Sequence, residues 1–421
     1  PGLHFKTKNS WVGHIPIESD VVKNGSLFFW MWGKDDVNAG DDLIIWINGG
    51  PGCSSMFGMV HENGPFKLQE KGSETTKPSD YSWTKVSNIV YVDQPAHVGF
   101  SQGRTYFTNE TQIGKEFASF LDNFYEIFPE LKPKRLWITG ESYAGIYLSY
   151  TLHELQARNQ SQLQGTLIVD GVITDQSMLE PPVYPFVVKH QVALNFSAED
   201  VQDVKDEAAR CNLTDYVERN LHYPPKGPLP EFDQSCSPYT MMAARASDRN
   251  TIFNVYNVEK PDIWDGDYTD YTDKFFNNGE LQDYINIPRK RWDECNYVFL
   301  HDDQSPPPDS IPDKRHSMLA QVIENSKKFM LISGNLDARV MTNMTALALQ
   351  NMTWAGSTGF SKAPGTPLYD IDGKEAGAFV EERGLIFAEI FESGHMVPKD
   401  NPPAGFAAVK HLLGQKDWSK K

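Results

Sequence analysis

Short apolar runs rich in β-branched and aromatic residues recur in the first third of the chain. They occupy residues 27–32, 43–48, 89–93, 135–140 and 165–171. By contrast, the stretch 113–128 repeats its apolar residues at three- and four-residue steps, which is the pattern of an amphipathic helix. Strand-like runs that alternate with a helix predict a mostly parallel central sheet with helices on both faces.

The pattern changes after about residue 178. From there to about residue 310 the chain is polar and irregular, with few signals of buried strands. The further predicted elements are a helix at 197–211, strands at 327–334 and 383–394, and a last helix at 405–414. We therefore expect an α/β core made of residues 1–177 and 311–421, with residues 178–310 as a cap or insertion over the active site.

Length and composition restrict the class of protein. The 421 residues can bury a large core, and 40% hydrophobic and 12% aromatic content exclude a globally disordered chain. The net charge of −17 argues against nucleic acid or an anionic membrane surface as a partner. No apolar run approaches the roughly 20 residues that span a bilayer. The sequence begins at Pro1 without a signal peptide, so we expect any secretory signal to lie outside it.

The cysteines and glycosylation motifs indicate an oxidising compartment. The four cysteines, an even number without CxxC or zinc-type spacing, are Cys53, Cys211, Cys236 and Cys295. Two disulfides are therefore favoured over a metal site, with three connectivities possible. Seven N-x-S/T motifs are present, at Asn24, Asn109, Asn159, Asn195, Asn212, Asn343 and Asn351. Together these features predict a secreted glycoprotein, or one of a vacuolar or lysosome-like compartment.

One serine lies at a predicted strand-to-helix junction. The stretch TGESYAG, residues 139–145, follows an apolar run and precedes a helical pattern. It nearly matches the G-x-S-x-G nucleophile elbow, with Ala144 in place of the second glycine. Ser142 can be a helix N-cap or a nucleophile, and we favour the nucleophile.

Two further polar residues follow predicted strands. Asp337 comes just after the predicted strand at 327–334, and His395 comes just after the predicted strand at 383–394. The order Ser142, Asp337, His395 is that of the α/β-hydrolase triad. His411 lies inside a helical pattern, and Asp370 and Asp372 lie in a polar turn. We therefore rank these three below His395 and Asp337 as members of the triad.

A glycine-rich stretch, WINGGPGCSS at residues 46–55, follows another predicted strand. Glycines allow the backbone to approach a ligand closely and to direct N–H groups toward it. The alternative is a tight structural turn. With a nucleophile in the same sheet, we favour an oxyanion hole formed by the N–H groups of Gly50 and Tyr143.

Several motifs together resemble the serine carboxypeptidase family of the α/β-hydrolase superfamily. They are NGGPGCSS, VDQPAHVGFS, GESYAG, TWAGSTGF and ESGHMVPKDNP, which spread over nearly the whole chain. The resemblance implies an α/β-hydrolase fold, the triad Ser142, Asp337 and His395, and an oxyanion hole at Gly50 and Tyr143. It further implies that the substrate's C-terminal carboxylate is bound by Asn48, Gly49, Glu62 and Glu141.

The same resemblance suggests roles for other residues. It places Met396 at the lining of the site and implies the disulfides Cys53–Cys295 and Cys211–Cys236. The chain departs from the family pattern at His97, Asp170 and Asn335, where the family often has Gly, Asn and Asp. None of these departures removes a member of the triad.

A carboxylate bound by two glutamates has a physical consequence. Glu62, Glu141 and a substrate carboxylate cannot all stay charged at close range, so at least one must be protonated and donate a hydrogen bond. The alternative for Glu141 is a buried side chain bonded to its own loop. If the glutamates bind the substrate carboxylate, KM for a peptide with a free C-terminus should rise with pH. KM for a peptide with a blocked C-terminus should rise much less.

The sequence therefore predicts a serine-type carboxypeptidase that releases C-terminal residues of peptides or proteins through an acyl-enzyme, favoured at acidic pH. The alternatives are an acyltransferase on the same scaffold and a catalytically silent binding or chaperone-like homologue. No metal ion or organic cofactor is expected. The expected partners are peptide C-termini and N-linked glycans, not nucleic acid, and no membrane span is expected in this chain.

Overall fold

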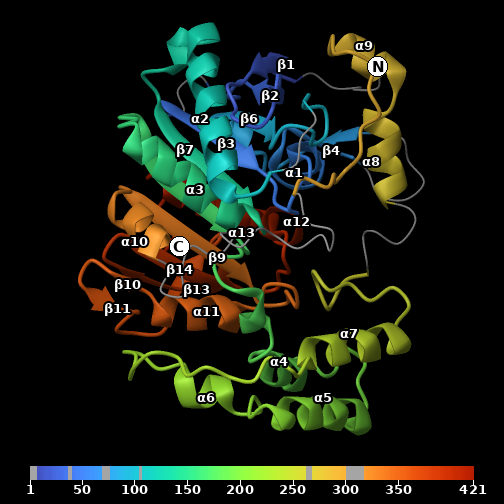
Figure 1. The fold of residues 1–421 in the computed structure, drawn as a ribbon, viewed down its shortest axis with the longest axis vertical. Helices are drawn as coiled ribbons and strands as arrows, with labels where there is room; N and C mark the ends of the chain where they lie inside the picture. Colours follow the sequence, from blue (N-terminus) through green and yellow to red (C-terminus); the bar gives the residue numbers. More distant parts are fainter. Residues whose placement is uncertain (1–6, 37–39, 69–75, 104–106, 262–267, 300–316) are drawn as a thin grey trace.

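A central sheet organises the fold. The computed structural model describes residues 7–36, 40–68, 76–103, 107–261, 268–299 and 317–421. Within them, ten strands form one sheet in the order β1-β2-β6-β3-β7-β8-β9-β14-β13-β12 (Figure 1). The strands are β1 Ser10–Pro16, β2 Ser26–Trp32, β3 Asp42–Ile47, β6 Asn88–Asp93, β7 Arg135–Glu141, β8 Leu163–Val169, β9 Lys328–Gly334, β12 Thr366–Tyr369, β13 Glu375–Glu382 and β14 Leu385–Ile390. Two short hairpins pair β4 Phe66–Leu68 with β5 Thr76–Pro78, and β10 Thr353–Trp354 with β11 Ser357–Thr358.

The centre of the sheet is parallel and its edges are antiparallel. Strands β6, β3, β7, β8, β9 and β14 pair in parallel, which confirms the predicted mostly parallel sheet. Strands β1 and β2 at one edge, and β13 and β12 at the other, pair antiparallel. The strand predicted at 383–394 ends already at Ile390, because residues 391–394 form the turn that leads to His395.

Helices cover both faces of the sheet. The helices around it are α1 Ser55–Gly58, α2 Glu110–Ile127, α3 Ala144–Ala157, α10 Ser317–Glu324, α11 Thr342–Asn351, α12 Val397–Asp400 and α13 Pro402–Leu412. Ile45 packs in the cluster that contains residues of α2 and α3, whereas its neighbour Trp46 packs with residues of α1 and α13. Alternate residues of a buried strand thus face two different layers. Among the described residues, no helix is long and apolar enough to cross a lipid bilayer.

Where the structure describes the segment from residue 178 to 299, its regular elements are helices joined by irregular stretches. Its helices are α4 Val183–Lys189, α5 Ala198–Arg210, α6 Tyr216–Asn220, α7 Pro238–Arg249, α8 Tyr268–Phe276 and α9 Gly279–Tyr284. Helices α4, α5 and α7 pack together, while Phe276 of α8 and Leu281 of α9 join a core cluster of the sheet. Figure 1 shows these two groups at opposite ends of the molecule. The predicted boundary at 310 and 311 lies outside the described residues.

Candidate functional site

Ser142 occupies a sharp elbow between β7 and α3. Its φ is +63°, in the left-handed region that a residue with a side chain seldom adopts. Its carbonyl accepts hydrogen bonds from Gly145 N at 2.9 Å and Val172 N at 2.9 Å, which hold the turn. A Cβ added to Gly140 would lie 2.7 Å from Ala144 Cβ, so strand and helix meet too closely for a larger residue. The N-cap of α3 is Tyr143, without a side-chain cap, so Ser142 does not serve as the cap.

His395 and Asp337 form a buried pair after two neighbouring strands. The distance from His395 Nδ1 to Asp337 Oδ2 is 2.6 Å, and their side chains are 3% and 0% exposed. The second oxygen of Asp337 accepts the backbone N–H of Arg339 at 2.6 Å. The backbone N–H of His395 donates to the carbonyl of Tyr256 at 2.7 Å, and the two rings lie 5.1 Å apart. This arrangement fixes the imidazole with Nδ1 toward the carboxylate.

Ser142 and His395 line the same cavity. It has a volume of ≈ 580 Å³. Its lining residues are Asn48, Gly49, Gly50, Cys53, Phe57, Glu141, Ser142, Tyr239, Ala243, Ser247, Phe253, Val255, Tyr256, Glu294, Cys295, His395 and Met396. His395 Nε2 is buried and has no hydrogen-bond partner among the described groups. The free nitrogen is therefore available to a group in the cavity.

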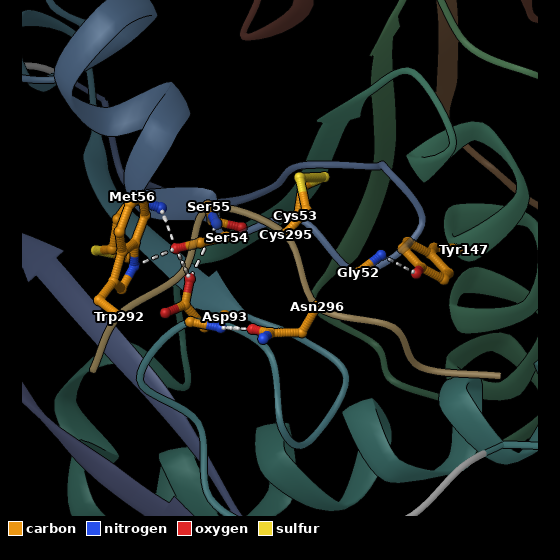
Figure 2. The surroundings of a disulfide bond; sticks show 11 residues. Gly52, Cys53, Ser54, Ser55, Met56, Asp93, Tyr147, Trp292, Cys295 and Asn296 are labelled. Carbon is orange, nitrogen blue, oxygen red and sulfur yellow. Dashed lines mark hydrogen bonds between the residues drawn. A yellow bond between two sulfur atoms is a disulfide. The ribbon is translucent and has the colours of Figure 1, made fainter. Parts of the chain in front are cut away.

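The glycine-rich loop after β3 lies against the elbow. Gly50 has a φ of +106°, and a Cβ on Gly49 would collide with the backbone nitrogen of Tyr143. Both positions therefore require glycine. The N–H of Gly52 donates to the hydroxyl of Tyr147 in α3 at 3.0 Å (Figure 2). The close approach of Gly49 to Tyr143 and the hydrogen bond from Gly52 to Tyr147 therefore hold this loop against the elbow.

Asp93 supports the other end of this loop. Its Oδ1 accepts the Ser54 hydroxyl at 2.6 Å and the Ser55 N–H at 2.9 Å. Trp292 Nε1 donates to the same Ser54 oxygen at 3.1 Å, as Figure 2 shows. Burial raises the pKa of Asp93 to about 6. The loop is therefore attached both to β6 and to the segment before Cys295.

Both disulfides have the pairing that the family resemblance implies. Cys53 is bonded to Cys295, which joins the glycine-rich loop to the segment after α9 (Figure 2). Cys211 is bonded to Cys236, which links the end of α5 to the start of α7.

Glu62 and Glu141 form a pair of buried carboxyl groups. Glu62 lies in the short π-helix Met59–Asn63, and Glu141 ends β7. Burial raises the pKa of Glu62; burial and then the charge of Glu62 raise the pKa of Glu141 well above its usual range. The Asn48 side chain lies beside Glu62, and Asn48 Oδ1 accepts Trp46 Nε1 at 2.8 Å. Asn48 and Glu141 line the cavity, and Glu141 Oε2 has no hydrogen-bond partner among the described groups.

The other predicted residues lie outside the cavity. His97, with a φ of +87°, and Asn335 do not line it, and Asp170 is buried next to Asp337. His411 lies in α13 and stacks on Trp418 at 4.7 Å. The turn residues Asp370 and Asp372 do not line the cavity either.

The seven predicted glycosylation sites differ in exposure. Asn24, Asn159, Asn195 and Asn212 are exposed, whereas Asn109, Asn343 and Asn351 are half-buried. Asn109 caps α2 by accepting the Gln112 N–H at 3.1 Å. Asn351 Oδ1 accepts the N–H of Leu229 at 3.0 Å.

Sequence reasoning missed one wall of the cavity. Tyr239, Ala243 and Ser247 lie four residues apart on α7, and so they share a helix face. Aromatic and apolar residues beside the glycine-rich loop and His395 complete the lining, among them Phe57 and Tyr256. The four-residue spacing was the available signal, but the polar character of this segment hid it.

The chain matches known proteins over nearly its whole length. A family model described as serine carboxypeptidase matches residues 1–415. A probable serine carboxypeptidase of Arthroderma benhamiae is 32% identical, covering 99% of this chain and 85% of the relative. Serine-type carboxypeptidase F of Aspergillus niger is also 32% identical, covering 99% and 86%. The solved structure of Kex1(Δ)p, a prohormone-processing carboxypeptidase from Saccharomyces cerevisiae, superposes with a TM-score of 0.78 at 22% identity, covering 98% of this chain and 94% of the other.

Proposed function

The chain belongs to the serine carboxypeptidase family, and we propose that Ser142, Asp337 and His395 are the triad of its serine-type carboxypeptidase activity. The fold is the α/β-hydrolase fold. The observation that carries the assignment is the 2.6 Å His395–Asp337 pair, buried at the cavity that the strained Ser142 also lines.

The proposed reaction begins with attack of Ser142 Oγ on the last peptide carbonyl. His395 Nε2 takes the hydroxyl proton, while Asp337 holds the opposite ring nitrogen and stabilises the imidazolium. The N–H groups of Gly50 and Tyr143 would stabilise the oxyanion. His395 then protonates the leaving amine, so the C-terminal residue departs and an acyl-enzyme remains. Water, deprotonated by His395, attacks the ester and restores Ser142.

Recognition of the chain end would depend on the carboxyl pair. A protonated Glu141 can donate a hydrogen bond to the substrate carboxylate, and the Asn48 amide and the Gly49 backbone lie at the same wall. The raised pKa values of Glu62 and Glu141 support this role, because they keep a proton on the pair above the range of ordinary glutamates. Binding of a free C-terminus should therefore be favoured at acidic pH. Met396 would contact the released residue from beside His395.

The proposed setting is a secreted or vacuolar, lysosome-like compartment. Two disulfides and four exposed glycosylation motifs support it, because both modifications occur along the secretory pathway. The division into core residues 1–177 and 311–421 and cap residues 178–310 is also a proposal. It is supported by the described helices of that segment and by α7, which forms one wall of the cavity.

The deciding experiment uses peptides that differ only in their last two residues. Mass spectra after incubation at acidic and neutral pH should show ladders shortened stepwise from the C-terminus, and Ser142→Ala should show none. An organophosphonate should label the wild type but not this variant. Internal cleavage, or acyl transfer to an added alcohol without hydrolysis, would overturn the proposal. A folded wild type that neither cuts nor labels would support a catalytically silent protein instead.

A further inference from the structure

Asp170 is a buried acid that the proposed reaction does not use. It follows β8 with a φ of +41°, and its side chain is 0% exposed. Its Oδ1 accepts the N–H of Gly334 at 2.9 Å and the hydroxyl of Ser333 at 3.1 Å. Its backbone N–H donates to the carbonyl of Ile332 at 2.8 Å. The carboxyl group is therefore anchored to the end of β9, the strand that leads to Asp337.

This anchoring places Asp170 against the proposed triad. One carboxylate oxygen each of Asp170 and Asp337 and one ring nitrogen of His395 lie within 4.8 Å of one another. Glu141, at the end of the neighbouring strand β7, also interacts with Asp170 through its charge. Arg339 lies beside Asp337, since its backbone N–H donates to Asp337 Oδ1 at 2.6 Å and its guanidinium interacts with Asp337 through its charge. The titratable groups around Asp170 are therefore Asp337, Glu141 and the imidazole of His395, with the positive charge of Arg339 beside Asp337.

Two buried carboxylates this close cannot both remain charged, so one proton resides on the pair. Asp337 accepts through both oxygens, Oδ2 from His395 Nδ1 and Oδ1 from the Arg339 N–H, each at 2.6 Å, whereas Asp170 accepts its shorter bonds through Oδ1 and only the 3.2 Å contact of the Gly334 N–H through Oδ2. The proton therefore resides on Asp170. Burial raises the pKa of Asp170 well above its usual range, and the charge of Asp337 raises it further.

We propose that Asp170 is a positioning residue whose protonated carboxyl donates a hydrogen bond to Asp337 and thereby orients Asp337 toward His395. The inference rests on the triad of the proposed function. When rising pH removes this proton, a second negative charge lies beside the imidazole. The hydrogen bond to Asp337 is then lost and the two carboxylates repel each other, so Asp337 no longer holds His395 Nδ1 in place. Turnover then falls on the alkaline side, for substrates with free and with blocked C-termini alike.

The kinetic test compares Asp170→Asn and Asp170→Ala with the wild type. The substrate is an ester whose C-terminal carboxyl group is blocked as an amide, because its binding does not need the Glu62–Glu141 pair. The rate constant kcat is measured from about pH 4 to 9. Asp170→Asn keeps a donor that cannot ionise, so its kcat should stay within about threefold at acidic pH while the alkaline fall moves up by about one pH unit or more. Asp170→Ala should lower kcat about tenfold or more at every pH, with little change in KM. An alkaline fall in Asp170→Asn identical to that of the wild type would overturn the proposal, as would an unimpaired Asp170→Ala.

A second measurement needs only the wild type and no activity. Infrared spectra of protein with ¹³C-labelled aspartate, taken at about pH 7.5, should contain the band of a protonated carboxyl group. Asp93, with its pKa raised to about 6, would be mostly ionised there. Absence of the band would overturn the proposal even if the Asp170 variants failed to fold. Loss of activity on dialysis against EDTA would do the same, because a cation rather than a proton would then hold the two aspartates. If the wild type neither hydrolyses the ester nor is labelled at Ser142, the triad assignment fails, whereas the infrared band still reports whether the Asp170–Asp337 pair holds a proton.

Discussion

The hydroxyl of Tyr147 accepts a 3.0 Å hydrogen bond from the backbone N–H of Gly52 (Figure 2). Tyr147 lies in α3, one turn after the elbow that presents Ser142, and Gly52 lies in the loop after β3. Both residues are buried. One side chain thus connects the helix behind the proposed nucleophile to the loop that carries Gly50.

We predict that Tyr147→Phe impairs turnover more than substrate binding. The variant leaves the buried Gly52 N–H without its acceptor, which costs about 1–3 kcal/mol and loosens the glycine-rich loop that carries Gly50. We expect kcat to fall about tenfold with KM changed less than threefold. Steady-state kinetics on a dipeptide substrate and urea unfolding measure the two effects.

Tyr125→Phe provides the matched control for that prediction. The Tyr125 hydroxyl is buried in α2 and has no hydrogen-bond partner among the described groups. Removing it should leave kcat unchanged and stability unchanged or slightly higher. If Tyr147→Phe behaves like this control, the Tyr147–Gly52 bond does not support the loop.

The paired glutamates predict a pH effect on KM rather than on kcat. Both groups have raised pKa values, so the pair loses its proton as pH rises, and the resulting charge repels a substrate carboxylate. KM for a peptide with a free C-terminus should rise about tenfold per pH unit at the alkaline end. KM for the amide-blocked peptide should rise much less.

The double variant Glu62→Gln/Glu141→Gln tests the origin of this effect. Its amides are neutral and remain donors at every pH, so KM for the free peptide should lose its alkaline rise. Initial rates across the pH range on both peptides give the comparison. Should the double variant keep the wild-type pH profile of KM, the proton does not reside on these two glutamates.

The buried strands could be predicted from the sequence because each is apolar almost throughout. β3 and β7 are completely or nearly completely buried, so their runs are unbroken, and polar residues such as Ser142 stand out where a run ends. The edge strand β1 consists of exposed and half-buried residues apart from a single buried one, so it gave no such signal. β12, with one buried residue, is missed for the same reason, and β13 is missed because half-buried and exposed residues interrupt its buried ones.

The contact between Asp170 and Asp337, and the part that residues after 178 take in the cavity, could not be predicted. Asp170 and Asp337 meet because β8 pairs with β9, and local sequence does not determine which strands are neighbours. Tyr239 reaches the cavity only because the segment after residue 178 folds back toward His395. Both contacts depend on tertiary packing, which the periodicity of a single segment does not contain.

The two disulfides should differ in their effect on activity. Cys53–Cys295 closes a separation of 242 residues, and Cys211–Cys236 one of 25. Loop-closure entropy assigns them about 5.5 and about 3.5 kcal/mol of stability. Replacing both cysteines of either pair by serine should therefore destabilise the protein, as measured by the urea midpoint.

Only the first pair lies at the cavity, so only Cys53→Ser/Cys295→Ser should also lower kcat. Two backbone hydrogen bonds remain in this variant, from Asn296 N to Gly52 O at 2.8 Å and from Ser54 N to Glu294 O at 2.7 Å. They should limit the loss of kcat to about tenfold. Cys211→Ser/Cys236→Ser, assayed below its unfolding midpoint, is the control and should keep wild-type kcat. Equal losses of kcat in the two variants would contradict this assignment.

The raised pKa of Glu116 predicts that the protein is less stable at neutral pH than at acidic pH. Its side chain is buried in α2, its Oε1 accepts the Ala96 N–H at 2.7 Å, and burial raises its pKa to about 8. An unfolded glutamate loses its proton near pH 4.3, so between about pH 4.3 and 8 the folded state binds more protons than the unfolded state. The free energy of unfolding therefore falls as pH rises through that range. At about 1.4 kcal/mol per pH unit, this group lowers stability by about 3 kcal/mol at pH 7 relative to pH 4.5.

Glu116→Gln removes this proton while its amide oxygen can still accept the Ala96 N–H. At about pH 4.5 the variant should unfold at nearly the wild-type urea concentration, and at about pH 7 it should be more stable by about 3 kcal/mol. Glu126→Gln, on the exposed side of the same helix, should change stability little at either pH. The deciding comparison is the loss of stability between about pH 4.5 and about pH 7. If Glu116→Gln loses as much stability as the wild type over this range, groups other than Glu116 cause the pH dependence.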